Sequence, residues 1–208
     1  MAKSSIKTKK RSIQVTGELK KDELLFQEIK ATFRLDTLGQ LFNILLVMKN
    51  IKPGAYITPH PKLKQTMLTF FEKYKLHYQI YNGFRPDTLR CFVSTKPITH
   101  NLIIKNKLQH LEIGKFLGYE CPGDFNSKTV PKIFISIDMG YSKPGKTNRI
   151  REQIYGFVCN SVSDNMLAKL ELKARQITKL GNNLPHLMPN FFCGIRGEFQ
   201  IYGKSHEY

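Results

Sequence analysis

The stretch KIFISIDMGYSKPGKTNRIREQIYGFVC, residues 132–159, is the segment from which we interpret the rest of the chain. It begins with apolar residues at alternating positions, Ile133, Ile135 and Ile137, a pattern typical of a buried strand. The chain then passes through the glycine- and lysine-rich segment 140–147 into basic residues able to open a helix. The stretch therefore places strand, loop and helix signals side by side.

The loop GYSKPGKT matches G-x-x-x-x-G-K-[ST], the pattern in which backbone N–H groups and one lysine surround the phosphates of a nucleotide. One alternative function is therefore nucleotide binding, and its site residues would be Gly140, Gly145, Lys146 and Thr147. Pro144 weakens this alternative because it removes a backbone donor from the loop. In addition, no clear apolar strand ending in aspartate follows to hold magnesium.

A third hypothesis comes from residues 137–140, Ile-Asp-Met-Gly, which look like the opening strand of ribonuclease-H-like nucleases, where an aspartate holds a metal ion. Such folds need further spaced carboxylates. The acidic residues that follow are Glu152, Asp164, Glu171, Glu198 and Glu207. The sequence thus offers few candidate ligands, and we expect no metal, no cofactor and no catalytic residues.

Charge is the strongest signal in the composition. The 208 residues contain 33 Lys and Arg against 16 Asp and Glu, a formal net charge of +17. A hydrophobic content of 41% is typical of a folded protein. Together these values predict a folded, non-catalytic protein that binds nucleic acid or an anionic protein assembly.

The positive charge falls in three segments. The first is a basic arm over residues 1–22, the second follows the central strand, and the third is the outer face of a helix near residue 170. In the arm the predicted phosphate contacts are Lys3, Lys7, Lys9, Lys10 and Arg11, close to Lys20 and Lys21. In the other two segments they are Lys143, Lys146, Arg149 and Arg151, and Lys169, Lys173 and Lys179, next to Arg175.

Caps and apolar spacing predict the remaining elements. Thr37 and Gln40 form a capping box for a helix that ends near Asn50. Further helices are expected to begin at Pro61, at Thr99 with Gly118 as its cap, and at Ser163 with Gly181 at its end. Strands are expected at 55–58, 76–81, 89–94 and 133–137, followed by one or two closing strands broken at 194–197. The fold class is α/β or α+β, one domain over residues 23–208 with a mixed sheet and about four helices.

The cysteines indicate the compartment. Cys91, Cys121, Cys159 and Cys193 are 30, 38 and 34 residues apart, which is not zinc-ligand spacing. Cys91 and Cys159 lie in apolar runs typical of reduced core thiols. The chain has no signal-peptide pattern and no apolar run of membrane-spanning length, so we expect an intracellular, reducing location and no membrane partner.

Two short motifs carry a resemblance. Residues 90–94 read RCFVS and residues 117–124 read LGYECPGD, in a chain rich in lysine, asparagine and isoleucine. This combination resembles uncharacterised small basic proteins of nucleocytoplasmic large DNA viruses. The resemblance implies a virion or replication-compartment protein, and it carries no catalytic motif.

Overall fold

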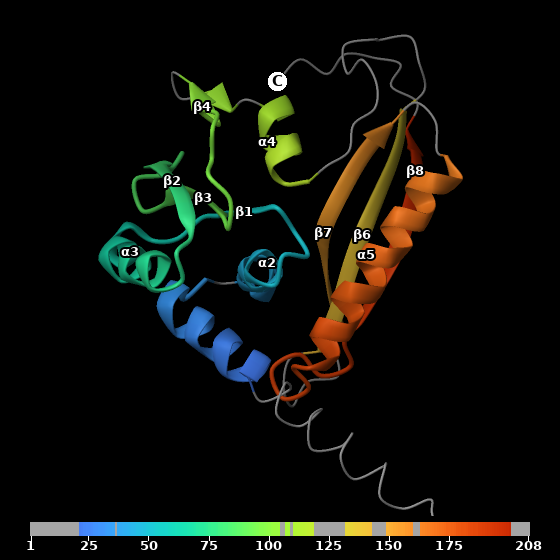
Figure 1. Ribbon diagram of the computed structural model, residues 1–208, viewed down its shortest axis with the longest axis horizontal. Helices are drawn as coiled ribbons and strands as arrows, with labels where there is room; N and C mark the ends of the chain where they lie inside the picture. The colour runs from blue at the N-terminus through green and yellow to red at the C-terminus, as the bar shows by residue number, and fades with distance from the viewer. Residues whose placement is uncertain are drawn as a thin grey trace, which may run out of the picture.

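The computed structural model describes residues 21–35, 37–104, 107–108, 110–118, 132–142, 149–159 and 163–200 (Figure 1). Most of the predicted basic arm, residues 1–20, lies outside the described residues. Its last two residues, Lys21 and Asp22, belong to a helix instead. The globular part therefore begins before Glu23, the start that the sequence suggested.

The helix over residues 21–33 was missed in the sequence analysis, although its pattern is clear in retrospect. Phe26, Ile29 and Phe33 are three and four residues apart and are all fully buried. The ring of Phe26 meets that of Phe42 edge-on, with centroids 6.2 Å apart. This helix is thus part of the core.

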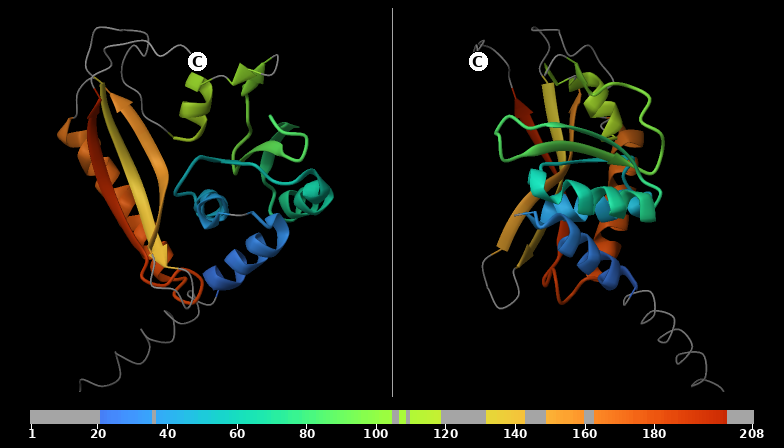
Figure 2. Two further views of the ribbon diagram at one scale, coloured as in Figure 1. Left: turned by 180° about the vertical axis from the view of Figure 1, so that it is seen from behind. Right: turned by 90° about the vertical axis from the view of Figure 1, so that its left-hand side faces the viewer.

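The next helix, α2 (Leu38–Met48), begins at the predicted cap and is buried on nearly all sides. The N–H of Gln40 donates to Thr37 Oγ1 at 3.5 Å, as expected. The Gln40 side chain does not complete the capping box, because its Oε1 accepts from the N–H of Thr58 at 3.0 Å. The helix is buried because it lies between two sheets (Figures 1 and 2).

The first of these sheets is antiparallel with the order β1-β3-β2, formed by Gly54–Ile57, Leu89–Ser94 and His77–Asn82. All three strands were predicted. Cys91 and Val93 on the central strand point into the main core with the helices. The helices on that side include α3 (Lys64–Lys73), which follows a short 3-10 turn, η1 (Pro61–Leu63).

The other face of this sheet carries Phe92, which packs in a smaller cluster with Leu102 and Ile103. Here the long helix expected from Thr99 is wrong. The chain forms a small antiparallel pair, β4 (Ile103–Ile104) and β5 (Lys107–Leu108), and only then the short helix α4 (His110–Phe116). The Gln79 side chain fixes a bent, non-helical backbone here: its Nε2 donates to the carbonyl of His100 at 2.9 Å, and its Oε1 accepts from the N–H of Leu102 at 3.4 Å.

The second sheet has the order β7-β6-β8, from Arg149–Cys159, Lys132–Ser142 and Phe192–Gln200. The predicted strand at 133–137 is therefore longer than expected, and the basic segment after residue 147 forms a strand and not a helix. The closing strand β8 is continuous through 194–197, where a break was predicted, because it pairs with β6 along that length.

Helix α5 (Asp164–Asn182) packs along this sheet (Figure 2). Ser163 caps it, as predicted, by accepting from the N–H of Met166 at 3.3 Å. Leu170, Ala174 and Ile177 form the buried stripe, whereas Leu167, also expected there, is 37% exposed. The helix ends one residue beyond Gly181, which is buried against the ring of Phe191.

Helix α2 reaches the second sheet at Gly39, where an added Cβ would overlap the carboxylate of Glu152 on β7. That carboxylate accepts from the hydroxyl of Tyr141 on β6 at 2.6 Å. Residues of both sheets and of the helices around them share one hydrophobic core. The fold is a single mixed α and β domain, with five α-helices and only antiparallel strand pairs among the described residues.

No helix within the described ranges is long and apolar enough to cross a membrane. Cys91 is buried and free, as predicted for a core thiol, and burial raises its pKa above the ordinary thiol range. Cys193 is also free, and burial raises its pKa to about 12. Neither thiol is therefore activated for nucleophilic chemistry.

Candidate anion-binding cleft

The three predicted basic segments are described to different extents. Lys169, Lys173 and Lys179 lie on α5, as expected, and Lys173 is half-buried. Arg151 lies on the outer strand β7, with its guanidinium 5.7 Å from the centroid of the Phe192 ring. Lys143 and Lys146, like the arm lysines, lie outside the described residues, and Arg149 is described only as part of β7.

The phosphate-loop pattern receives no structural support. Gly140 is part of β6, where an added Cβ would overlap the ring of Phe192, so the glycine is explained by packing. Residues 143–148 connect two antiparallel strands, whereas a phosphate cradle joins a strand to the N-terminus of a helix. Gly145, Lys146 and Thr147 themselves lie outside the described residues.

The nuclease hypothesis needs acidic neighbours around Asp138. Its partners across the sheet are Gln153 on β7 and Gly194 on β8, neither of which is a metal ligand of the required kind. The described part of the chain contains no group of three His, Cys, Asp or Glu side chains able to hold a metal ion. A nuclease centre at Asp138 therefore has no support within that part.

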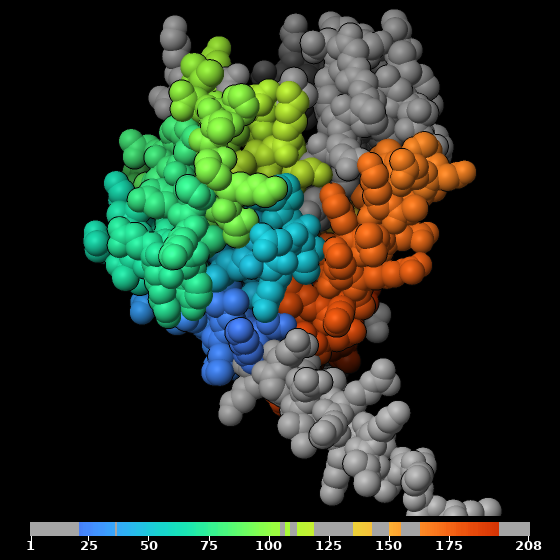
Figure 3. Space-filling model, viewed as in Figure 1, coloured from blue at the N-terminus to red at the C-terminus, as the bar shows by residue number. Residues whose placement is uncertain are grey.

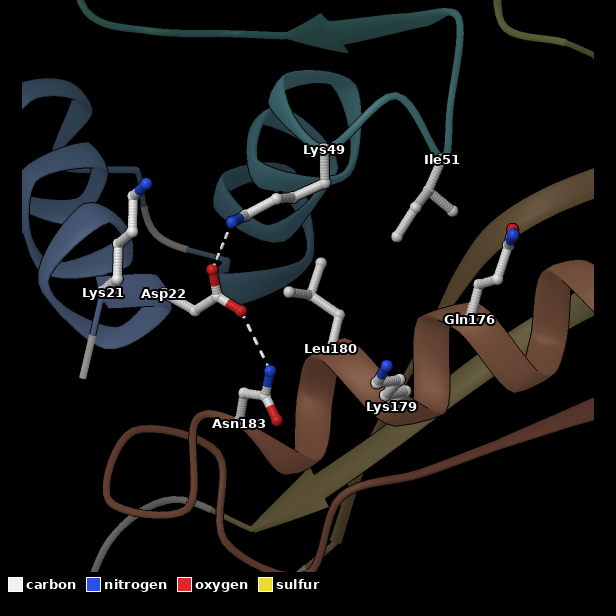
Figure 4. A pocket seen from close by; sticks show the side chains of 8 residues that line it. All are labelled: Lys21, Asp22, Lys49, Ile51, Gln176, Lys179, Leu180 and Asn183. Atoms are coloured by element: carbon white, nitrogen blue, oxygen red, sulfur yellow. Dashed lines mark hydrogen bonds and ion pairs between the residues drawn. The ribbon is translucent and has the colours of Figure 1, made fainter. Parts of the chain in front are cut away.

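Helix 21–33, α2 and α5 meet on the face of the molecule seen in Figure 3. A pocket of about 390 Å³ lies where the start of the first of these helices meets the ends of the other two (Figure 4). Three of its lining side chains are lysines, and each comes from a different helix or its cap. The residues that line it are Lys21, Asp22, Lys49, Ile51, Gln176, Lys179, Leu180 and Asn183. With one aspartate against three lysines, the lining carries a net charge of +2.

Asp22 holds this pocket together. It is 6% exposed, and one of its carboxylate oxygens forms an ion pair with Lys49 while the other accepts from Asn183 Nδ2 at 2.9 Å (Figure 4). Lys49 and Asn183 are the C-caps of α2 and α5. Both carboxylate oxygens of Asp22 are bonded within the protein, so its negative charge mainly offsets the positive charge of Lys49. The positive charges of Lys21 and Lys179 can then interact with a ligand.

The positive surface continues from the pocket along α5. Lys169, Lys173 and Gln176 are four and three residues apart, so they lie along one side of the helix, and Gln176 lines the pocket. Beneath this side lies Lys52, only 3% exposed, whose Nζ donates to Asn43 Oδ1 at 2.9 Å and to the carbonyl of Ile154 at 2.8 Å. Burial, and then the charge of Lys173, lowers the pKa of Lys52 to about 7.

Sequence reasoning found only part of this site. It identified the α5 lysines, assigned Lys21 to the arm and overlooked Lys49. We define the lysine cleft as Lys21, Lys49 and Lys179 with the α5 residues Lys169 and Lys173. Comparisons with family models, curated proteins and solved structures gave no match.

Proposed function

We propose that this chain is a non-catalytic basic protein that binds the phosphate backbone of nucleic acid in the lysine cleft. The observation that carries the proposal is the convergence of Lys21, Lys49 and Lys179 from three helices on one pocket. Backbone phosphates are the common anion that such a site fits, since lysine contacts them as a point charge without reading bases.

The predicted basic arm is joined to the chain next to this pocket. Residues 1–20 join the chain at Lys21, which lines the pocket, so Lys3, Lys7, Lys9, Lys10 and Arg11 are tethered to its rim. A strand held in the cleft would therefore lie within reach of further cations. Each phosphate that is neutralised releases condensed counterions, which makes binding depend steeply on salt.

The test is a salt series with the full-length protein and labelled DNA or RNA, read by fluorescence anisotropy. The double variant Lys21→Gln with Lys179→Gln should bind all sequences more weakly. On duplex DNA it should lower the slope of log affinity against log salt by about 0.9 for each phosphate that the variant no longer neutralises. Lys96→Gln, an exposed lysine on the loop after β3, is the matched control and should leave the slope unchanged.

Deleting residues 1–20 should weaken binding about equally across sequences and flatten the slope further. If the full-length protein retains neither DNA nor RNA even at about 50 mM salt, the proposal is wrong. An anionic protein assembly would then be the partner. The virion or replication-compartment setting implied by the sequence resemblance belongs to the same proposal, because both hold concentrated nucleic acid.

A further inference from the structure

The hairpin between β2 and β3 presents an aromatic ring that no core requires. Phe84, near its tip, is 74% exposed, the highest value among the large apolar side chains that the structure describes. The residues that follow it, Arg85, Pro86 and Asp87, are also exposed. The residues that follow the ring thus include no other large apolar side chain, which does not fit an apolar protein-docking patch.

The side chain of Arg90 packs on one face of the Phe84 ring. The guanidinium of Arg90 on β3 lies 4.4 Å from the centroid of the Phe84 ring. Arg90 is only 3% exposed, and its Nε donates to the carbonyl of Asn82 at 2.7 Å. One face of the ring is thus covered by a fixed cation, and the high exposure of Phe84 leaves the other face open to solvent.

The loop that carries the ring is closed by its own hydrogen bonds. The N–H of Gly83 donates to the carbonyl of Thr88 at 2.9 Å, and the N–H of Thr88 donates to the carbonyl of Arg85 at 3.1 Å. Thr88 packs so closely on Gly83 that an added Cβ there would overlap it. Little conformational entropy therefore remains to be lost when a ligand orders the ring.

The guanidinium behind the ring forms no ion pair with an acidic side chain among the residues that the structure describes. The Nη1 of Arg90 is buried and has no hydrogen-bond partner in the part of the chain that the structure describes. A guanidinium on one face of an aromatic ring makes the stack more favourable for a flat ligand on the opposite face. One more cation, Arg85, directly follows Phe84 in the loop and is exposed.

We infer that Phe84 is a stacking platform for an unpaired nucleobase, so that the nucleic acid bound by this protein is single-stranded. The inference rests on the proposed function and restricts the partner to single-stranded nucleic acid. In a duplex each base is already stacked between its neighbours and has no free face for Phe84. In a single strand every base can offer a free face, and an aromatic side chain can stack on all four bases.

The experiment compares single-stranded and duplex oligonucleotides of one sequence with the full-length protein. Phe84→Ala should weaken binding of the single strand by about fivefold to 150-fold, the usual range for one stacked base. The affinity of Phe84→Ala for the duplex should equal that of the wild type. The slope of its log affinity against log salt should also not change, because stacking releases no counterions. Phe84→Tyr, which keeps the ring, should bind like the wild type, and Ile104→Ala, an exposed apolar residue on β4, is the control for general surface effects.

A strand containing 2-aminopurine gives a direct readout, since its fluorescence should be quenched by the wild type and by Phe84→Tyr but not by Phe84→Ala. Single-strand affinity unchanged in Phe84→Ala would overturn this inference and leave the lysine cleft standing. An equal loss on the duplex would also overturn it. Failure of the wild type to retain either nucleic acid would overturn the proposed function together with the stacking platform.

Discussion

Replacing Lys52 by methionine should change how the stability of the protein depends on pH. Lys52 is 3% exposed and donates to Asn43 Oδ1 and to the carbonyl of Ile154. A neutral amine carries the two N–H groups that these bonds use. Burial lowers the pKa of Lys52 from 10.5 to about 7, a change worth about 5 kcal/mol between its two protonation states.

The sign follows from the protons bound in each state. Between about pH 7 and about pH 10.5 the unfolded chain holds a proton on Lys52 and the folded chain does not, so the free energy of unfolding rises with pH. Below about pH 7 both states are protonated, and this residue adds no pH dependence. Between about pH 6 and about pH 9 the wild type should gain about 2.7 kcal/mol relative to Lys52→Met.

The assay is urea unfolding of both proteins at several pH values, with the free energy of unfolding extrapolated to water. Other ionisable groups are common to the two proteins, so their contributions cancel in the difference. The missing hydrogen bonds and the altered packing in Lys52→Met shift that difference by an amount that does not depend on pH. If the difference stays constant from about pH 6 to about pH 9, the pKa of Lys52 in the folded protein is not lowered and the reasoning is wrong.

Two further predictions concern the second sheet. Gly39→Ala should lower the free energy of unfolding by about 1–3 kcal/mol, because its Cβ would push Glu152 away from Tyr141. In a Glu152→Ala background the same substitution should lower it little. Urea unfolding of the wild type, the two single variants and the double variant tests this. ATP or GTP with magnesium should not raise the melting temperature, since residues 143–148 connect antiparallel strands. A nucleotide-dependent rise that is abolished in Lys146→Ala would revive the phosphate-loop interpretation.

Local patterns in the sequence predicted the helices that have both a cap and a regular apolar stripe. Helix α5 begins at Ser163 and buries Leu170, Ala174 and Ile177. Between residues 99 and 118 the same reasoning failed. Ile104, Leu108 and Leu111 have helical spacing, yet Gln79, a residue distant in sequence, fixes a bent, non-helical backbone near residue 101. A contact of this kind leaves no signal in the segment that it reshapes.

The candidate site shows the same limit in a different form. Lys179 was predicted as a phosphate contact because it lies on a recognisable basic helix. No pattern in the sequence around Lys49 marks that residue as a contact. The two lysines line one pocket because Asp22 joins the ends of two helices. At Gly140 a short motif suggested a ligand, and the packing of Phe192 gives a second explanation for the glycine that the motif alone does not reveal.

The hydrogen bond between Asp22 and Asn183 links residues 161 positions apart. During synthesis the N-terminal side of the pocket leaves the ribosome long before α5, and closing so long a loop must wait for the later helix. A nascent chain consequently exposes Lys21 and Lys49 without the surface that completes their site. Under the proposed function, tight binding of an anion would therefore begin only after α5 has left the ribosome and packed against these residues.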